Sequence, residues 1–267
     1  MNRISFDPLR TLGMPRLVHI KPEHMYRHLE QIRLADWLLF PAAWQLNALH
    51  YGLGRRIFPS PATYHLGHSK IEMTRALRAV CPDNVPETWI GAATPAQLEE
   101  ALDSLSLPLV AKVPRSARGE GVHLIESRAE LLAYARHSEV LYLQEYLPIV
   151  RDLRIVYVGD RVVSAYWRQA APGVFHTNVA RGGRVHFDDI PAAAIALVEQ
   201  VARRLGIDHA GFDVAEVQGW FYILEFNPLF GLEALNRQGI RIAPLIDDYL
   251  RRAGGPADRD PDTPLAA

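Results

Sequence analysis

Two consecutive strand-like segments near the C-terminus carry acidic side chains among apolar residues. Asp213 lies in the first segment, and Glu225 and Asn227 lie in the second. The pair Gln218-Gly219 between them is typical of a tight hairpin turn. Because side chains alternate along a strand, Glu225 and Asn227 share one sheet face, and the hairpin brings Asp213 opposite them. The chain is therefore expected to contain an antiparallel sheet with one polar face.

The polar face of this hairpin is a candidate cation site. Buried carboxylates cost several kcal/mol unless they are paired or bound to a metal. Carboxylate and amide oxygens suit Mg²⁺ that is held jointly with phosphates. The alternation also predicts that four neighbouring residues face the core, namely Phe212, Val214, Leu224 and Phe226. The alternative interpretation is an ordinary solvated face of an antiparallel sheet.

The first 58 residues favour a small parallel sheet. Strand-like segments cover residues 17–20, 37–40 and 56–58, and helix-like segments over 22–34 and 42–51 separate them. A strand–helix–strand–helix–strand order is typical of parallel sheets. Residues 1–14 show no clear periodicity.

The rest of the chain has a different order of elements. A helix is expected over 69–80, followed by a β-α-β-β-α-β unit between residues 88 and 144. Three strand candidates then cover 152–157, 162–168 and 184–187, with Gly159-Asp160 as a hairpin turn between the first two. A helix over 191–205 ends at Gly206, and a last helix covers 243–253. The C-terminal residues, rich in Gly, Pro and Asp, are predicted to be disordered.

Lys112 ends one strand of the β-α-β-β-α-β unit and precedes a loop with two glycines, Gly119 and Gly121. Backbone N–H groups of such a loop can converge on phosphate oxygens. Lys112, Arg115 and Arg118 would add positive charge. The alternative is a basic surface hairpin.

Further cations and amides follow in the next strands and the loop after them. They are Arg154, Arg168, Asn178, Arg181 and Arg184. Guanidinium groups bind carboxylates and phosphates in a bidentate manner, although each of these residues alone could be a surface arginine or amide. The run Gln144-Glu145-Tyr146 alone indicates only the end of a strand.

Composition excludes several classes of protein. The chain has 267 residues and a formal net charge of −1, which argues against a general attraction to nucleic acid or membrane surfaces. One cysteine, Cys81, rules out an internal disulfide and is expected to be a structural thiol. Residues 1–21 lack the pattern of a signal peptide, and the sequence predicts a cytoplasmic protein.

Taken in order, these motifs resemble the ATP-grasp superfamily, and more closely its alpha-L-glutamate ligase (RimK-like) branch. The resemblance covers about residues 70–232. Its motifs are Ser69-Lys70, Leu109-Val110-Ala111-Lys112 with Gly119 and Gly121, Gln144-Glu145-Tyr146, Asp152-Leu153-Arg154 with Val158-Gly159-Asp160, Asn178-x-x-Arg181-Gly182-Gly183, Gly211-Phe212-Asp213 and Glu225-Phe226-Asn227.

The resemblance implies a role for each matching residue. Lys70 and Lys112 are expected on the ATP phosphates, Gly119 and Gly121 in a flexible lid loop, and Glu145 and Tyr146 around adenine, with Asp152 on the ribose side. Asp213, Glu225 and Asn227 are expected to bind Mg²⁺ or Mn²⁺. Arg168, Asn178 and Arg181 are expected near the γ-phosphate and the acyl phosphate. The sequence departs from the family at Pro228-Leu229-Phe230, where small residues are usual.

The resemblance also implies the architecture. We expect an α+β ATP-grasp fold with a short N-terminal α/β lobe over residues 1–66 and an ATP-grasp domain over 67–255. That domain comprises a lid at about 87–143 and a C-terminal antiparallel-sheet subdomain. Residues 256–267 form the predicted disordered tail.

The implied activity is an ATP-dependent ligase that joins a carboxylate to an amine through an acyl phosphate. Amino acids or peptides are the expected substrates, and a natural-product acceptor is an alternative. No nucleic acid or membrane partner is expected, and a homo-oligomer stays open. A nucleotide-binding regulatory module without turnover is the competing function, and a structural scaffold explains none of the motif order.

Overall fold

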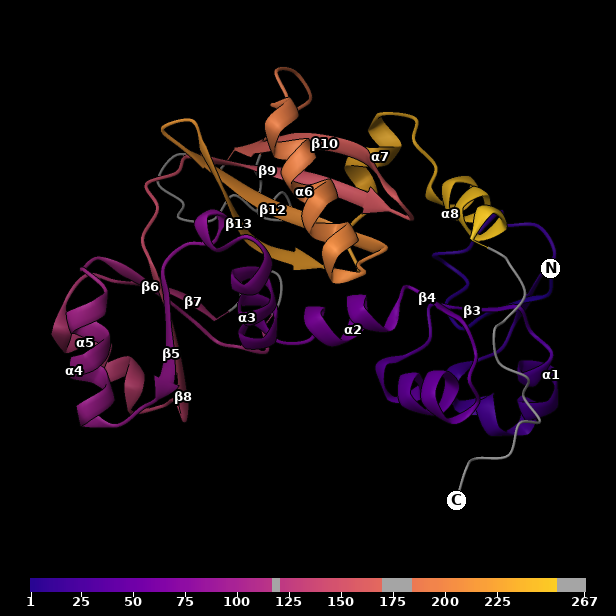
Figure 1. Ribbon diagram of the computed structural model, residues 1–267, viewed down its shortest axis with the longest axis horizontal. Helices are drawn as coiled ribbons and strands as arrows, with labels where there is room; N and C mark the ends of the chain where they lie inside the picture. Colours follow the sequence, from indigo (N-terminus) through magenta and orange to yellow (C-terminus); the bar gives the residue numbers. More distant parts are fainter. Residues whose placement is uncertain (117–120, 170–183, 254–267) are drawn as a thin grey trace.

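The computed structural model describes residues 1–116, 121–169 and 184–253 of the chain. These residues form three β-sheets that follow one another along the sequence. Figure 1 shows the first two sheets toward opposite ends of the long axis, with the third sheet above the helices between them. Parallel and antiparallel sheets combined with helices confirm the predicted α+β class. The predicted tail, 256–267, lies outside the described residues.

A parallel sheet forms the N-terminal lobe, as the sequence predicts, in the order β2-β1-β3-β4. Its strands are β1 (Arg3–Ser5), β2 (Leu17–His19), β3 (Trp37–Leu39) and β4 (Ile57–Phe58). The sequence pattern does not predict β1, because two of its three residues are polar. The buried Arg3 side chain forms an ion pair with Asp247, which explains how the strand carries a charge inside the protein.

The helices of this lobe are shorter and less regular than predicted. The expected helix over 22–34 is a 3-10 helix, η1 (Pro22–His28), followed by α1 (Leu29–Arg33), because His28 leaves helical conformation with φ −118°. The expected helix over 42–51 is replaced by a 3-10 turn, η2 (Ala43–Gln45), and a π-helical turn, η3 (Ala48–Gly52).

The second sheet is antiparallel, with the order β5-β8-β6-β7. Its strands and helices follow the predicted β-α-β-β-α-β order: β5 (Thr88–Ala92), α4 (Pro95–Ser104), β6 (Leu109–Lys112), β7 (Val122–Ile125), α5 (Arg128–Ala135) and β8 (Val140–Glu145). Before it come α2 (Pro61–Gly67), which the sequence analysis does not predict, α3 (Lys70–Val80) and η4 (Pro82–Asn84).

The third sheet is antiparallel, with the order β11-β10-β9-β12-β13. Its strands are β9 (Arg151–Val158), β10 (Arg161–Gln169), β11 (Arg184–His186), β12 (His209–Val217) and β13 (Trp220–Asn227). Both predicted hairpin turns are confirmed: Gly159 has φ +71°, and Gln218 and Gly219 both have positive φ. The remaining helices are α6 (Ala192–Leu205), α7 (Glu233–Arg237) and α8 (Ile242–Arg252).

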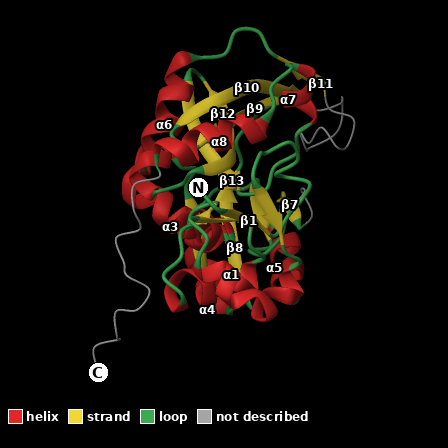
Figure 2. Cartoon of the chain, turned by 90° about the vertical axis from the view of Figure 1, so that its right-hand side faces the viewer, coloured by secondary structure: helices red, strands yellow, loops and turns green. Residues whose placement is uncertain are grey.

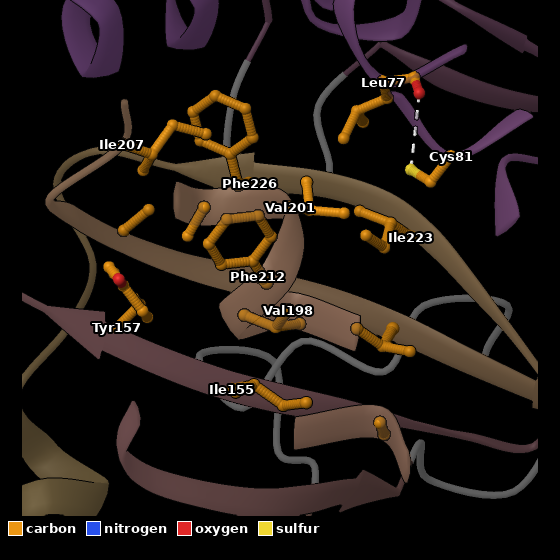
Figure 3. Close-up of a cluster of buried hydrophobic side chains, with 14 of the residues drawn as sticks. Leu77, Cys81, Ile155, Tyr157, Val198, Val201, Ile207, Phe212, Ile223 and Phe226 are labelled. Carbon is orange, nitrogen blue, oxygen red and sulfur yellow. Dashed lines mark hydrogen bonds between the residues drawn. The ribbon is translucent and has the colours of Figure 1, made fainter. Parts of the chain in front are cut away.

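Helices α3 and α6 cover one face of the third sheet, and the view in Figure 2 shows α6 along its side. Apolar side chains from these helices and from alternate strand positions form the core drawn in Figure 3. Cys81 belongs to this core, where its thiol donates to the carbonyl of Leu77 at 3.3 Å. Burial raises the pKa of Cys81 to about 11, as expected for a structural thiol.

One predicted core residue of this sheet is wrong. Phe212, Val214 and Phe226 are buried, but Ile223 takes the core position that alternation assigns to Leu224. The register shifts between Asp213 and Val214, which pair with Glu225 and Ile223. This β-bulge leaves Leu224 as an extra residue of β13 and moves every later pairing by one position.

No helix in the described part of the chain combines the length and the apolar character needed to cross a bilayer.

The N-terminal lobe meets the third sheet at a buried polar contact. The Asp208 carboxylate accepts hydrogen bonds from the Ser60 backbone N–H at 2.7 Å and from the Thr63 hydroxyl at 3.2 Å. Burial raises the pKa of Asp208 to about 7, although these hydrogen bonds act in the opposite direction. Asp208 therefore holds the start of α2 against the strand that follows it, β12.

The raised pKa of Asp208 predicts how stability depends on pH. In the folded protein Asp208 keeps its proton up to about pH 7, whereas in the unfolded chain, with an Asp pKa near 3.9, it loses the proton at a lower pH. This contribution to stability therefore falls as the pH rises from about 4 to about 7, by about 1.4 kcal/mol per pKa unit. We expect Asp208→Asn to be better tolerated at pH 8 than at pH 5 in urea unfolding experiments. Asp188→Asn, at an exposed carboxylate, is the control; an equal difference from wild type at both pH values would contradict the assignment.

Candidate functional site

Charged side chains form a row across one face of the third sheet. The register pairs Arg168 of β10 with Asp152 of β9, Arg154 of β9 with Asp213 of β12, and Asp213 with Glu225 of β13. Asn227 lies two residues after Glu225 and pairs with Gly211. Because alternate residues of these strands enter the core with α3 and α6, the row lies on the opposite face. The predicted placement of Asp213 opposite Glu225 is confirmed.

Two arginines share the Asp213 carboxylate. Its Oδ1 atom is 2.7 Å from Nε of Arg154 and 3.0 Å from Nη2 of Arg168, and Oδ2 accepts from Nη2 of Arg154 at 3.3 Å. Arg168 also donates to both carboxylate oxygens of Asp152, with 2.8 Å between Nε and Oδ1. The four side chains form one buried network in which each charge has an opposite partner.

The network fixes the charge states of its members. Burial raises the pKa of Asp213 to about 6, while Arg154 and Arg168 act against this rise and keep the carboxylate ionised near neutral pH. Burial alone would lower the pKa of Arg168, but Asp213 and Asp152 outweigh it and raise the pKa above its ordinary value. Asp152 is thus engaged with Arg168, and its expected contact with a ribose stays a prediction.

Lys70, at the start of α3, reaches the other end of the row. Its Nζ atom lies 3.6 Å from Oε2 of Glu225 and donates to the backbone carbonyl of Ser116 at 2.6 Å. Oε1 of Glu225 accepts from the Asn227 amide at 3.2 Å. Burial raises the pKa of Glu225, but the positive charges of Lys70 and Lys112 outweigh it, so the net shift is downward.

Lys112 is buried at the end of β6. Its Nζ atom donates to Oε1 of Gln144 at 2.6 Å, and the Gln144 amide in turn donates to the Thr88 hydroxyl at 2.9 Å. Burial lowers the pKa of Lys112 to about 8, and the charge of Glu225 partly opposes this shift. Lys70 from helix α3 and Lys112 from strand β6 of the second sheet thus both act on the Glu225 carboxylate.

A cavity of about 260 Å³ lies where these elements meet. The end of α2, the start of α3, the segment after β6 and the end of β13 line it. The lining residues are Gly67, His68, Lys70, Met73, Pro114, Arg115, Ser116, Glu225, Phe226 and Asn227. Three predicted phosphate and metal residues, Lys70, Glu225 and Asn227, thus line one cavity.

The remaining predicted site residues have varied positions. Glu145 ends β8, where its carboxylate accepts from the Glu87 N–H at 2.7 Å, and Tyr146 follows it on the way to β9. Gly121 has φ +67°, and its carbonyl accepts from the Val113 N–H at 2.7 Å. Three predicted residues, Gly119, Asn178 and Arg181, lie outside the described residues.

The site contains side chains to which the sequence analysis gives no role. Arg154 and Gln144 appear there as members of motifs without a role of their own, and Ser116 is not mentioned. The signal for Arg154 is its spacing of two residues from Asp152, which places both on one face of β9. The contacts of Gln144 and Ser116 depend on tertiary packing, which spacing does not reveal.

The chain after Asn227 is held from two sides. The His209 Nδ1 atom lies 2.7 Å from the Pro228 carbonyl oxygen, and because a carbonyl only accepts, Nδ1 carries the proton. Burial lowers the pKa of His209 to about 3, so the ring is neutral. It stacks on Phe230 with 4.7 Å between ring centroids. On the other side, a Cβ atom at Gly67 would lie 2.2 Å from Cγ of Pro228.

Comparison with known structures identifies the fold. A RimK domain ATP-grasp protein from Sphaerobacter thermophilus superimposes with a TM-score of 0.65 and 20% identity, over 80% of this chain and 81% of that one. D-alanine–D-alanine ligase from Bacillus anthracis, complexed with ATP, gives a TM-score of 0.70 and 14% identity, over 94% of this chain and 97% of that one. At these identities the likeness shows the fold alone, and it confirms the predicted ATP-grasp fold.

Sequence comparison defines the family. Residues 75–250 match the model of the RimK-like ATP-grasp domain, and the chain belongs to this family. A relative named probable alpha-L-glutamate ligase, from Serratia proteamaculans (strain 568), is 35% identical over 159 residues, which cover 57% of this chain and 53% of that protein. The chain spans about half the length of the curated relatives that it matches.

The close approach of Gly67 to Pro228 predicts the effect of a methyl group there. Gly67→Ala should lower the free energy of unfolding by about 1–3 kcal/mol, because Pro228 and Phe226 must move to accommodate the Cβ atom. Gly231→Ala is a matched control, since a Cβ atom there has nothing within 4 Å. Thermal and urea unfolding measure both variants; equal stability of the two would contradict the packing described.

Proposed function

We propose that the chain is an ATP-dependent carboxylate–amine ligase. In this reaction the γ-phosphoryl group of ATP is transferred to a substrate carboxylate, and an amine then displaces phosphate to form an amide. Support comes from family membership and from relatives named as glutamate ligases. The observation that carries the proposal is the composition of the buried charge cluster, since its chemistry fits a triphosphate with its metal ion.

The cluster has an excess of positive charge. Among the described residues, four cations, Lys70, Lys112, Arg154 and Arg168, accompany the three carboxylates of Asp152, Asp213 and Glu225. Burial makes an uncompensated positive charge costly, and a nucleotide phosphate chain would neutralise it. Burial lowers the pKa of Lys112, in agreement with this cost, and the nearby charge of Lys70 adds to the shift. A pocket with this charge therefore favours an anionic ligand.

The donor set also fits a divalent metal that is shared with the nucleotide. Within the described residues, no group of three or more His, Cys, Asp and Glu side chains could hold a metal ion. Mg²⁺ usually binds through one or two carboxylates together with phosphate oxygens and water. Glu225 and Asn227, with Asp213 beside them, would supply such a partial set. The bound metal would neutralise charge on the phosphates during transfer.

The remaining residues would position and stabilise the reacting groups. Lys70 and Lys112 would bind phosphate oxygens, with Gln144 orienting the Lys112 ammonium group. Arg168, held by two carboxylates, would stabilise the charge of the transferring phosphoryl group without needing to reorganise. We propose that Asn178 and Arg181 assist it there, that Gly119 and Gly121 belong to a lid over the phosphates, and that Glu145, Tyr146 and Asp152 bind the nucleoside.

Other aspects of the proposal rest on the family. We propose amino-acid or peptide substrates, Mg²⁺ or Mn²⁺ as the metal, a cytoplasmic location and the domain division at residues 66 and 255. The three sheets at residues 3–58, 88–145 and 151–227 support this division. A homo-oligomer stays a prediction.

Release of ADP from ATP·Mg with a panel of amino acids and dipeptides tests the proposed activity. Release should need both a carboxylate and an amine, and Lys112→Ala should reduce it by at least about 100-fold, because a buried phosphate contact is lost. Arg115→Ala, nearby in the segment after β6, is a comparison that keeps the Lys112–Gln144 pair. Nucleotide binding without release for any pair would favour the regulatory alternative.

Replacement of Glu225 tests the proposed metal ligands. Glu225→Ala should abolish metal-dependent turnover and remove the dependence of nucleotide affinity on Mg²⁺, since the shared carboxylate is gone. Glu216→Ala on the neighbouring strand removes a carboxylate outside the cluster and should leave turnover unchanged. Turnover by Glu225→Ala at the wild-type rate would remove Glu225 from the metal site.

A further inference from the structure

Arg10 lies at a place in the fold where open parallel sheets bind ligands. It belongs to the segment that follows β1, at the carboxyl edge of the N-terminal sheet. Ligands of such sheets bind in the crevice outside the carboxyl ends of the strands. Figure 1 shows this lobe at the end of the molecule away from the second sheet, which carries Lys112. Arg10 thus lies in a different lobe from Lys112.

The backbone that carries Arg10 is well fixed. The Asp7 carboxylate accepts from the N–H groups of Leu9 at 3.0 Å and Arg10 at 3.2 Å. The buried Thr11 hydroxyl bonds to the Asp7 carbonyl and to the Ser5 hydroxyl, each at 2.9 Å. A turn with this many internal hydrogen bonds presents its arginine in a defined direction.

The guanidinium of Arg10 is poorly paired for its degree of burial. Its side chain is 22% exposed, and its nearest carboxylate oxygen, Oδ2 of Asp7, lies 3.6 Å from Nε. Nη1 reaches the Phe230 carbonyl only at 3.5 Å, and the group lies 5.9 Å from the centre of the Phe40 ring. Burial lowers the pKa of Arg10, and Asp7 and Tyr64 only partly oppose this.

The contrast with Arg154 and Arg168 is informative. These two arginines bind carboxylates at 2.7–3.0 Å through the Nε–Nη2 edge of the guanidinium group. A guanidinium has five N–H donors, and leaving most of them without short bonds in a half-buried position is costly. Within the described residues, Arg10 therefore keeps its donors available for an additional anion.

The distance to the proposed metal site limits the size of that anion. Phe230, which Arg10 contacts, is three residues from Asn227, and three residues span at most about 10 Å. The reacting carboxylate must lie beside the phosphates, and Arg10 is not among the residues that line the cavity with Lys70 and Glu225, so we assign Arg10 to a different group of the substrate. A substrate of amino-acid or dipeptide length could bridge the two places through a second carboxylate.

We propose that Arg10 is a specificity-determining residue that binds a non-reacting carboxylate of an amino-acid or short-peptide substrate. This inference rests on the proposed ligase function. Arginine suits the role because its planar fork binds a carboxylate with two parallel hydrogen bonds. The carboxylate could belong to the acid that is activated or to the amine that attacks, and the experiment separates these two sources.

The test compares each carboxylate substrate with its amide. ADP release is measured with L-glutamate, its α-amide and its γ-amide as acids, and with amino acids and amino-acid amides as amines. For the substrate that Arg10 binds, the amide should raise KM about 10- to 100-fold with little change in kcat. Arg10→Met should raise KM for the carboxylate form by a similar factor and abolish the preference over the amide. Arg10→Lys should restore part of it, and Arg16→Met, at an exposed arginine of the same segment, should match wild type.

If no substrate pair supports turnover, binding is measured instead. Calorimetry compares wild type with Arg10→Met for L-glutamate and a panel of dipeptides, with and without a non-hydrolysable ATP analogue. Weaker binding by Arg10→Met alone supports the inference. Equal binding and equal KM values for both proteins would overturn the inference. So would a protein that binds the ATP analogue but none of the panel carboxylates, and in both cases the proposed nucleotide binding would stand. If wild type does not bind the analogue, the proposed function itself is wrong.

Discussion

The shared carboxylate of Asp213 is the contact on which the rest of the site depends. Two arginines approach it within 3.0 Å, and one of them is also held by Asp152. None of these charges could be buried alone, because each would pay the cost of leaving water without compensation. Together they fix the orientation of Arg168 and place the row of Glu225 and Asn227 beside it. The sheet therefore acts as a rigid support whose polar face is already arranged for the anionic ligand that we propose.

Much of this site could be predicted from local sequence rules. The turn at Gln218-Gly219 and the alternation of side chains predict a hairpin that carries Asp213 and Glu225 on neighbouring strands. With that turn alone Asp213 would pair with Leu224, and the bulge at Leu224 is what brings Glu225 opposite Asp213. The same rules fail at Leu224, because a bulge changes the alternation and no local signal marks its position. They also fail at β1, where the buried Arg3 is explained only by Asp247 of α8, more than 200 residues away. Contacts between distant segments, such as Lys112 with Gln144, need the tertiary structure.

The contact between the N-terminal lobe and the third sheet connects the fold to the proposed substrate site. His209 was one of many scattered histidines in the sequence, and its neutral, buried ring turns out to hold Pro228 and Phe230. Phe40 and Phe58 from the lobe pack edge-on against the same ring. The segment predicted to depart from the family pattern is thus anchored to the lobe that carries Arg10. Changes in that segment and in the lobe are expected to act together on the proposed substrate site.

The two-residue turn between β12 and β13 has an evolutionary consequence. Both of its residues adopt positive φ, and the hairpin already contains one register shift, the bulge at Leu224. A single inserted residue would require either a second bulge or a slip that carries Glu225 and Asn227 to the opposite face. Descendants of this sequence can therefore vary the amino acids of the hairpin, but insertions and deletions between residues 213 and 225 should be rare in functional relatives.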